Sequence, residues 1–223
     1  MAKNAILITG KKRSGKDYVA EAIQKALKDV DISSKIFRFA DPMKDILSTT
    51  LHCTKSELEF WKNNESSITL PNGREVSFRA ILQKFGTEAM KPIFGDDVWA
   101  SLLCDEALEN SVNIAVISDW RFNIEIVTVS EYFNSYTVGV INNDIVSKDT
   151  HSSETELDDT IVHFLIDNTG KPDLTEQINA CLEHYKNYCK EYNGGDIAPN
   201  YDAIYEAMDK AIRDVKSINV ERE

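Results

Sequence analysis

Residues 5–17 read Ala-Ile-Leu-Ile-Thr-Gly-Lys-Lys-Arg-Ser-Gly-Lys-Asp, a short apolar run followed by a basic stretch with two glycines. The apolar run, 5–9, has the length and composition of a buried parallel strand. From about residue 17 to residue 28, apolar side chains recur at helical spacing and form one stripe. The segment therefore predicts a strand, a glycine-containing loop and a helix, which is how an α/β fold begins.

The loop, residues 10–16, matches the first seven positions of the phosphate-binding pattern G-x-x-x-x-G-K-[S/T]. In that pattern backbone N–H groups and the helix N-terminus face a phosphate, and the lysine reaches the β and γ oxygens. At the eighth position Asp17 replaces the hydroxyl that normally ligates Mg²⁺, and its carboxylate could hold the metal through water. A basic turn without a ligand is the alternative. The candidate ATP-binding residues here are Gly10, Lys12, Arg13, Ser14, Gly15, Lys16, Asp17 and Tyr18.

Strand-like and helix-like patterns alternate through the rest of the chain. This rhythm predicts a mainly parallel sheet covered by helices on both faces. Strands are expected at 36–39, 113–118, 138–141 and 162–167, and helices at 43–51, 79–90, 96–110, from about 121 to 133, 174–190 and 201–216.

Three segments are expected to lie outside this regular pattern. Residues 52–78 form an excursion with a hairpin around Pro71-Asn72-Gly73. The polar span 142–160 is interpreted as a lid, and residues 191–223 as a helical tail that follows one domain, 1–190.

Composition excludes several classes of protein. Hydrophobic residues make up 42% and charged residues 28% of the 223, as in globular domains. No apolar run approaches the ~20 residues of a membrane helix, and the first residues lack a secretory signal, so we expect a cytoplasmic protein without a membrane partner. Four cysteines without a CxxC pair indicate reduced thiols. A net charge of −12 argues against a nucleic acid polymer as partner and leaves small nucleotides possible.

Two strand ends carry further candidates. Asp119 follows the strand 113–118, where such sheets face their nucleotide, and could hold a metal-bound water; a cap or turn is the alternative. Arg121 could grip a phosphate or form a surface salt bridge. Asn168 and Gly170 follow the last strand, where this fold class meets adenine, although an ordinary turn is also typical of such residues.

Several segments resemble one family, the bacteriophage deoxynucleoside monophosphate kinases. They are the loop with its aspartate, 10–17, then 39–45, Arg79 with 82–87 and Trp99, 118–121, and 150–154. The likeness runs from residue 5 to about residue 185. It implies a three-layer P-loop NTPase fold, an α/β fold with a mainly parallel five-stranded sheet, an acceptor-binding insertion and a lid.

The resemblance also implies a reaction in deoxynucleotide biosynthesis, with ATP as co-substrate and Mg²⁺ as cofactor, in the host cytoplasm if the chain is phage-encoded. The γ-phosphate of ATP would pass to a deoxynucleoside monophosphate. The implied catalytic residues are Lys16, Arg13, Arg121 and Arg79; the acceptor-binding residues are Asp41, Lys44, Arg79, Gln83, Trp99, Asp119 and Arg121; the lid residues are Lys148, His151 and Glu154; and the metal residues, through water, are Asp17 and Asp119. Where the family often has an arginine at the start of the lid, this chain has Asn142 and Asn143. Assembly as a homodimer is left open.

Two alternatives remain. Animal-type phosphomevalonate kinases share the loop and the strand-end Asp-x-Arg, but the segment Gln83 to Thr87 with Trp99 favours a nucleotide acceptor, because an aromatic ring can stack on a base. A tryptophan on a helix is also often a core residue. The second alternative is a nucleotide-binding switch without transfer, although the guanine-reading motif Asn-Lys-x-Asp is absent from the sequence.

Overall fold

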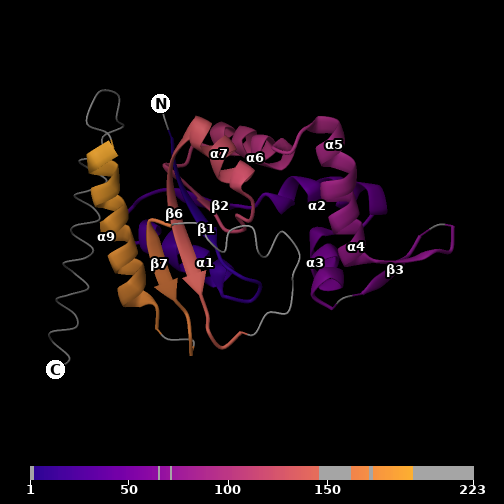
Figure 1. Ribbon diagram of the computed structural model, residues 1–223, viewed down its shortest axis with the longest axis horizontal. Helices are drawn as coiled ribbons and strands as arrows, with labels where there is room; N and C mark the ends of the chain where they lie inside the picture. Colours follow the sequence, from indigo (N-terminus) through magenta and orange to yellow (C-terminus); the bar gives the residue numbers. More distant parts are fainter. Residues whose placement is uncertain (1–2, 65, 71, 146–161, 171–172, 193–223) are drawn as a thin grey trace. The chain divides into compact units, whose positions relative to one another are not determined.

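The computed structural model describes residues 3–64, 66–70, 72–145, 162–170 and 173–192. The chain divides into two compact units (Figure 1). We call them the sheet unit, Met1–Arg38 with Ala107–Glu223, and the helical unit, Phe39–Glu106.

Within the described residues, the sheet unit is built on a five-stranded sheet in the order β2-β5-β1-β6-β7. Every neighbouring pair in it is parallel, which confirms the predicted sheet. The central strand β1 pairs with β5 from Asn4↔Ile114 onward and with β6 from Lys3↔Phe133 onward. The strands are β1 (Lys3–Thr9), β2 (Ser34–Phe37), β5 (Ile114–Ile117), β6 (Phe133–Ile141) and β7 (Phe164–Asp167).

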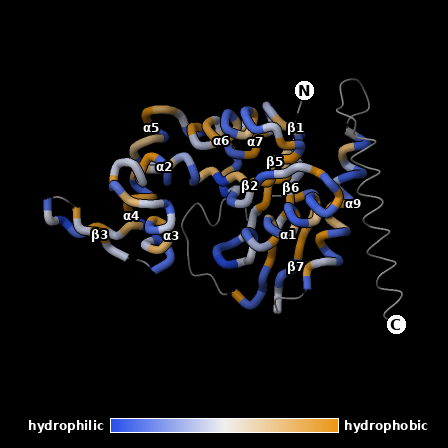
Figure 2. The backbone as a smooth tube through the Cα atoms, turned by 180° about the vertical axis from the view of Figure 1, so that it is seen from behind, coloured by the Kyte–Doolittle hydropathy of each residue, from blue (hydrophilic) through white to orange (hydrophobic). Residues whose placement is uncertain are grey.

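Helices cover both faces of this sheet. On one face, α1 (Lys16–Lys28) packs against α9 (Thr175–Tyr192), and Ile6 and Ile8 of β1 share a core cluster with Ile23 and Ile178 of these helices. Side chains alternate along a strand, so Ala5 and Leu7 point to the opposite face, where they are also fully buried. Helix α7 (Asn123–Tyr132) contacts β6 and β1. The strands appear largely orange in the hydropathy view (Figure 2), as expected of strands buried on both faces.

The boundary between α7 and β6 differs from the prediction. A helix was expected through about Phe133 and a strand only from 138, but β6 already begins at Phe133. Residues 133–137 pair in register with the start of β1, and the amide of Asn134 donates to Asn4 Oδ1 at 3.1 Å. Pairing with a distant strand therefore overrides the local helical pattern.

The helical unit contains a small core of its own, formed around Leu47, Leu58 and Phe78. Thr54 and Glu57 form a reciprocal capping box at the start of the helix that begins at Lys55. Its elements are α2 (Ala40–Leu51), α3 (Lys55–Asn63), β3 (Ser67–Thr69), β4 (Glu75–Ser77), α4 (Phe78–Gln83), the π-helix η1 (Lys84–Met90), α5 (Lys91–Phe94) and most of α6 (Val98–Glu109), which continues into the sheet unit.

Two predictions in this unit can be compared with the structure. Strands β3 and β4 pair antiparallel, with Ile68 opposite Val76, where the hairpin was predicted. The single helix expected at 79–90 is interrupted, because the backbone becomes π-helical after Gln83. A wider turn of this kind is not visible in apolar spacing, and π-helical turns are frequent at functional sites.

Some predicted segments lie outside the described residues. They are most of the lid, from residue 146 to residue 160, and the tail from 193 onward, including the helix expected at 201–216. Among the described helices, none combines the length and the apolar character needed to cross a membrane.

Candidate active site

The phosphate loop connects β1 to α1 in the sheet unit. Two of its residues have left-handed backbone angles, Arg13 (φ 70°) and Gly15 (φ 96°). A non-glycine residue in this region costs about 1–2 kcal/mol, and such strain clusters at functional sites. The turn is closed by a hydrogen bond from the Ser14 N–H to the Lys11 carbonyl at 2.9 Å. The sequence therefore places a compact turn directly before the N-terminus of α1.

Lys16 and Ser14 point into the protein rather than into solvent. Lys16 is only 8% exposed although it carries a charge. Ser14 is 2% exposed, and its hydroxyl oxygen has no hydrogen-bond partner among the described residues. Buried polar groups are normally satisfied, so an orphaned hydroxyl in this loop indicates a place for a further polar ligand.

Asn168 lies directly after β7 and holds the loop from the side. Its side-chain amide donates to the Ser14 carbonyl at 2.9 Å, and its backbone N–H donates to the Ile141 carbonyl at 2.9 Å. A Cβ atom added to Gly15 would overlap this amide. Asn168, which was predicted to contact ATP, thus uses its side-chain amide to bind the backbone of the phosphate loop.

The two other predicted ATP-side residues lie at the surface. Gly170 has a left-handed backbone (φ 72°), and its N–H donates to the Asp144 carboxylate at 2.7 Å. Tyr18, on α1, is 56% exposed and lines a hollow of about 430 Å³ between α1 and α9, together with Lys25 and Asp173. Sequence reasoning did not identify Asp144.

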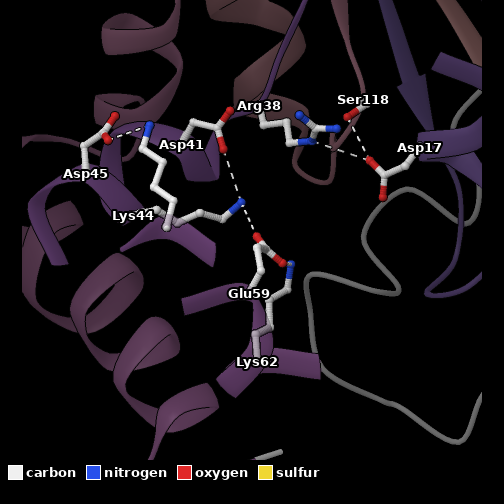
Figure 3. A network of polar contacts seen from close by, with 9 residues as sticks. Asp17, Arg38, Asp41, Lys44, Asp45, Glu59, Lys62 and Ser118 are labelled. Atoms are coloured by element: carbon white, nitrogen blue, oxygen red, sulfur yellow. Dashed lines mark hydrogen bonds and ion pairs between the residues drawn. The ribbon is translucent and has the colours of Figure 1, made fainter. Parts of the chain in front are cut away.

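The Asp17 carboxylate has two partners in the sheet unit (Figure 3). The hydroxyl of Ser118 donates to Asp17 Oδ1 at 3.1 Å, and Arg38 Nε lies 3.6 Å from the same oxygen. Ser118 and Arg38 follow β5 and β2, whose last residues, Ile117 and Phe37, are paired. Sequence reasoning did not include either partner, although the carboxyl ends of parallel strands meet at the edge where ligands bind.

Asp119 and Arg121 lie in the segment between β5 and α7, which is held by hydrogen bonds of Trp120 and Glu125. The fully buried Trp120 donates from its indole N–H to the Phe122 carbonyl at 3.0 Å. The carboxylate of Glu125, 8% exposed, accepts from the backbone N–H groups of Arg121 at 2.8 Å and Phe122 at 3.0 Å. These contacts fix the backbone that carries the two predicted side chains, and Glu125 is a further residue that sequence reasoning missed.

In the helical unit, Lys44 is buried between two acidic side chains (Figure 3). Its Nζ lies 2.6 Å from Glu59 Oε1 and 3.2 Å from Asp41 Oδ1. Burial lowers the pKa of Lys44, but the two carboxylates more than offset this effect, so its pKa is raised. Burial raises the pKa of Glu59, but Lys44 and then Lys62 outweigh it and leave that pKa lowered. Lys44 is thus part of an ion-pair network with Asp41 and Glu59. The sequence analysis did not predict Glu59 as a member of this network.

Trp99 belongs to the interior of the helical unit. It is 8% exposed, its indole N–H donates to the Gly86 carbonyl at 2.9 Å, and its ring centre lies 6.4 Å from that of Phe85. These contacts are those expected if Trp99 is a core residue, the alternative to stacking on a base. Arg79 and Gln83, both on α4, are half-buried.

The predicted site residues are therefore distributed over both units. The loop, Asn168, Gly170, Asp119 and Arg121 lie in the sheet unit, while Asp41, Lys44, Arg79, Gln83 and Trp99 lie in the helical unit. Lys148, His151 and Glu154 lie outside the described residues. Within the part of the chain that the structure describes, no group of three or more His, Cys, Asp or Glu side chains is placed to bind a metal ion on its own.

A glycine loop between the first strand and first helix of a parallel sheet defines the P-loop class of α/β proteins. The chain belongs to the deoxynucleotide monophosphate kinase family, whose model matches residues 56–178. It is thus a nucleotide kinase, a phosphotransferase. The phosphate loop and the strands β1 and β2 precede the matched segment. Their part in the site is therefore inferred from their own residues and not from the family match.

Solved structures of kinases match this chain at low identity and with low TM-scores. The Cys556Ala mutant of the APS kinase CysC of Mycobacterium tuberculosis is 12% identical, with a TM-score of 0.43, over 83% of this chain and 98% of that chain. The same kinase in complex with AMPPNP and APS is also 12% identical, with a TM-score of 0.39 over the same shares. No curated protein matches the chain.

Proposed function

We propose that this nucleotide kinase transfers the γ-phosphoryl group of ATP to a deoxynucleoside monophosphate and releases ADP and the deoxynucleoside diphosphate. The observation that carries the proposal is the loop between β1 and α1, with buried Lys16 and the orphaned hydroxyl of Ser14, in a chain of this family. Both groups suit phosphate oxygens, which accept hydrogen bonds and attract cations.

The donor triphosphate is assigned to the loop. Backbone N–H groups of the loop and the N-terminus of α1 would face its phosphates. Lys16 and Arg13 would neutralise the moving group, which passes through a loose transition state in which positioning and charge matter most. The proposed ATP-binding residues are Gly10, Lys12, Arg13, Ser14, Gly15, Lys16, Asp17, Tyr18, Asn168 and Gly170, with Asn168 acting through the loop.

Asp17 and Asp119 would hold Mg²⁺ through water. Mg²⁺ usually keeps several waters and uses one or two carboxylates plus substrate phosphates, which suits two separate aspartates better than an all-protein cage. The Asp17 side chain is 63% exposed, and both of its partners among the described residues use Oδ1, so Oδ2 can accept from a metal-bound water. When bound, Mg²⁺ would supply positive charge that offsets the charge on the transferred phosphoryl group.

The acceptor is assigned to the remaining polar residues of the predicted site. Arg121 and Arg79 would hold its monophosphate, because a guanidinium matches phosphate oxygens in two parallel bonds. Asp41 and Gln83 would bond the sugar or base, and Lys44, tied to Asp41, would orient that carboxylate. The attacking phosphate oxygen is already a nucleophile, so alignment with the γ-phosphorus replaces a strong general base.

A panel of acceptors tests the proposal. ADP release is measured with each deoxynucleoside monophosphate, each ribonucleotide counterpart and phosphomevalonate. Turnover with at least one deoxynucleotide supports it; turnover only with phosphomevalonate, or tight ATP binding without any transfer, contradicts it. Lys16→Ala is expected to lower transfer by about 10²–10³-fold. Lys28→Ala, at the exposed end of the same helix, is the matched control and should leave transfer unchanged.

A further inference from the structure

We propose that Ser118 is a positioning residue of the phosphate-transfer site: its hydroxyl holds Oδ1 of Asp17 and thereby presents Oδ2 to a magnesium-bound water. The inference rests on the proposed function, in which Asp17 holds the metal. It concerns a residue that lies directly after β5 and donates to this carboxylate of α1 from 101 positions away in sequence.

Ser118 is a rigid support. It follows β5 directly, and its backbone N–H donates to the Phe37 carbonyl at the end of β2 at 3.2 Å, which continues the hydrogen bonding between the two strands one residue past β5. The residue is 0% exposed, so its side chain has little room to move. Its position is therefore fixed by the sheet rather than by the phosphate loop.

The contact joins a buried donor to an exposed acceptor. A buried hydroxyl without a partner would cost stability, and Asp17 supplies the partner. A hydrogen bond to a charged acceptor is stronger than one between neutral groups. Asp17 itself has a side chain that is 63% exposed and would otherwise exchange between staggered rotamers. The Ser118 hydroxyl therefore restricts the carboxylate to one orientation.

Arg38 supports the same orientation less directly. Its Nε lies 3.6 Å from Asp17 Oδ1, beyond the range of a normal hydrogen bond, and its side chain is 31% exposed. Arg38 places a positive charge near the carboxylate, whereas the hydrogen bond from Ser118 sets the orientation of that carboxylate. In the usual pattern one hydroxyl follows the loop lysine. Here Asp17 occupies that position, and the hydroxyl of the residue after β5 donates to it.

The test measures binding rather than turnover. A non-hydrolysable ATP analogue is titrated calorimetrically in saturating magnesium and in EDTA, and the ratio of the two dissociation constants defines the magnesium gain. Ser118→Ala should reduce this gain by about threefold to tenfold, the worth of one hydrogen bond. Affinity in EDTA should remain unchanged, because the loop contacts are intact.

A double-mutant cycle shows whether Ser118 acts through Asp17. Asp17→Ala should lose at least as much of the gain as Ser118→Ala, and the double variant should lose no more than Asp17→Ala alone. Additive losses would overturn the positioning role, as would an unchanged gain in Ser118→Ala. A full gain in Asp17→Ala would instead reject the metal assignment of Asp17. The acceptor panel with the wild-type chain tests the kinase proposal independently of both.

Two further variants distinguish a loss of the Ser118 hydrogen bond from a general loss of folding. Ser34→Ala removes another buried serine hydroxyl, on β2, that has no partner among the described residues, and it should leave the gain unchanged. Ser118→Cys keeps the side-chain size but replaces a strong donor with a weak one, so it should lower the gain even if Ser118→Ala folds poorly. A normal gain in a folded Ser118→Cys would count against the proposal.

Discussion

The side-chain amide of Asn168 donates to the Ser14 carbonyl across 2.9 Å and so links the end of β7 to the phosphate loop, 154 residues earlier in the chain. Asn168 is 7% exposed, and Gly15 lies so close to its amide that any Cβ there would overlap it. The shape of the loop thus depends on a residue that is distant in sequence but in direct contact with it.

Asn168→Ala removes this link and should weaken binding of an ATP analogue by about threefold to tenfold, because the Ser14 carbonyl loses its donor. Calorimetric titration measures the effect. Asn134→Ala is the matched control: its amide bonds Asn4 at the opposite end of β1, so it should lower the melting temperature without changing nucleotide affinity. Equal affinity losses in both variants would show that Asn168 contributes only to general stability.

Trp99→Phe distinguishes a core tryptophan from one that stacks on a base. The variant leaves the Gly86 carbonyl without its donor and should reduce the free energy of unfolding by about 1–3 kcal/mol. The KM for the acceptor should change less than threefold, since the ring is 8% exposed. Urea unfolding and acceptor kinetics test both parts. Unchanged stability with a much higher KM would instead support stacking on the acceptor base.

Glu59→Gln should lower the melting temperature near pH 7, because the variant loses the charge that pairs with Lys44. The pKa of Glu59 is lowered in the folded chain, so its contribution is present above the unfolded-state pKa of about 4.3 and is lost as the pH falls through the folded-state value. The difference in melting temperature between the variant and the wild type should therefore become smaller as the pH is lowered. Glu88→Gln, at an exposed position of η1, should show no such pattern.

His163 makes the sheet unit sensitive to mild acid. Its Nδ1 accepts from the Thr137 N–H at 3.0 Å, and burial, followed by the nearby His184, lowers its pKa. Since the unfolded state takes up the proton first, stability should be intact at pH 7.5 and decline below the unfolded-state pKa of about 6.5. Urea unfolding between pH 5 and 7.5 measures the decline.

The control for this pH effect is a second histidine. His163→Asn should flatten the decline. His52→Asn should leave it unchanged, because His52 is exposed and its left-handed backbone (φ 52°) suits asparagine. A decline of equal steepness in His163→Asn would assign it to other groups.

Local patterns were sufficient for the parts of this site that are continuous in sequence. Residues 5–28 predict β1, the loop and α1, because apolar spacing and glycine position act within one stretch of chain. The partners of Asp17 could not be found in this way: Ser118 and Arg38 become neighbours only through the pairing of β2 with β5. The Lys44–Glu59 pair likewise joins two helices, and local spacing does not encode their packing.

Asn168 shows a different limit. Its position after the last described strand was predicted correctly, but its hydrogen bond to the loop backbone was not, because a polar residue type does not indicate which partner it will have. The early start of β6 and the π-helix after Gln83 were missed because both depend on tertiary contacts or on backbone geometry that side-chain spacing does not report.

The central place of β1 in the sheet also has a consequence for how the protein is made. Both neighbours of β1 come late: residues 114–117 on one side and 133–139 on the other. On the ribosome the apolar residues 5–8 have no strand partner until residues 114–117 have been made, whereas the helical unit, 39–106, contains all of its own core residues. Non-local pairing of this kind slows folding and exposes strand edges, so early translation is when this chain most needs a chaperone.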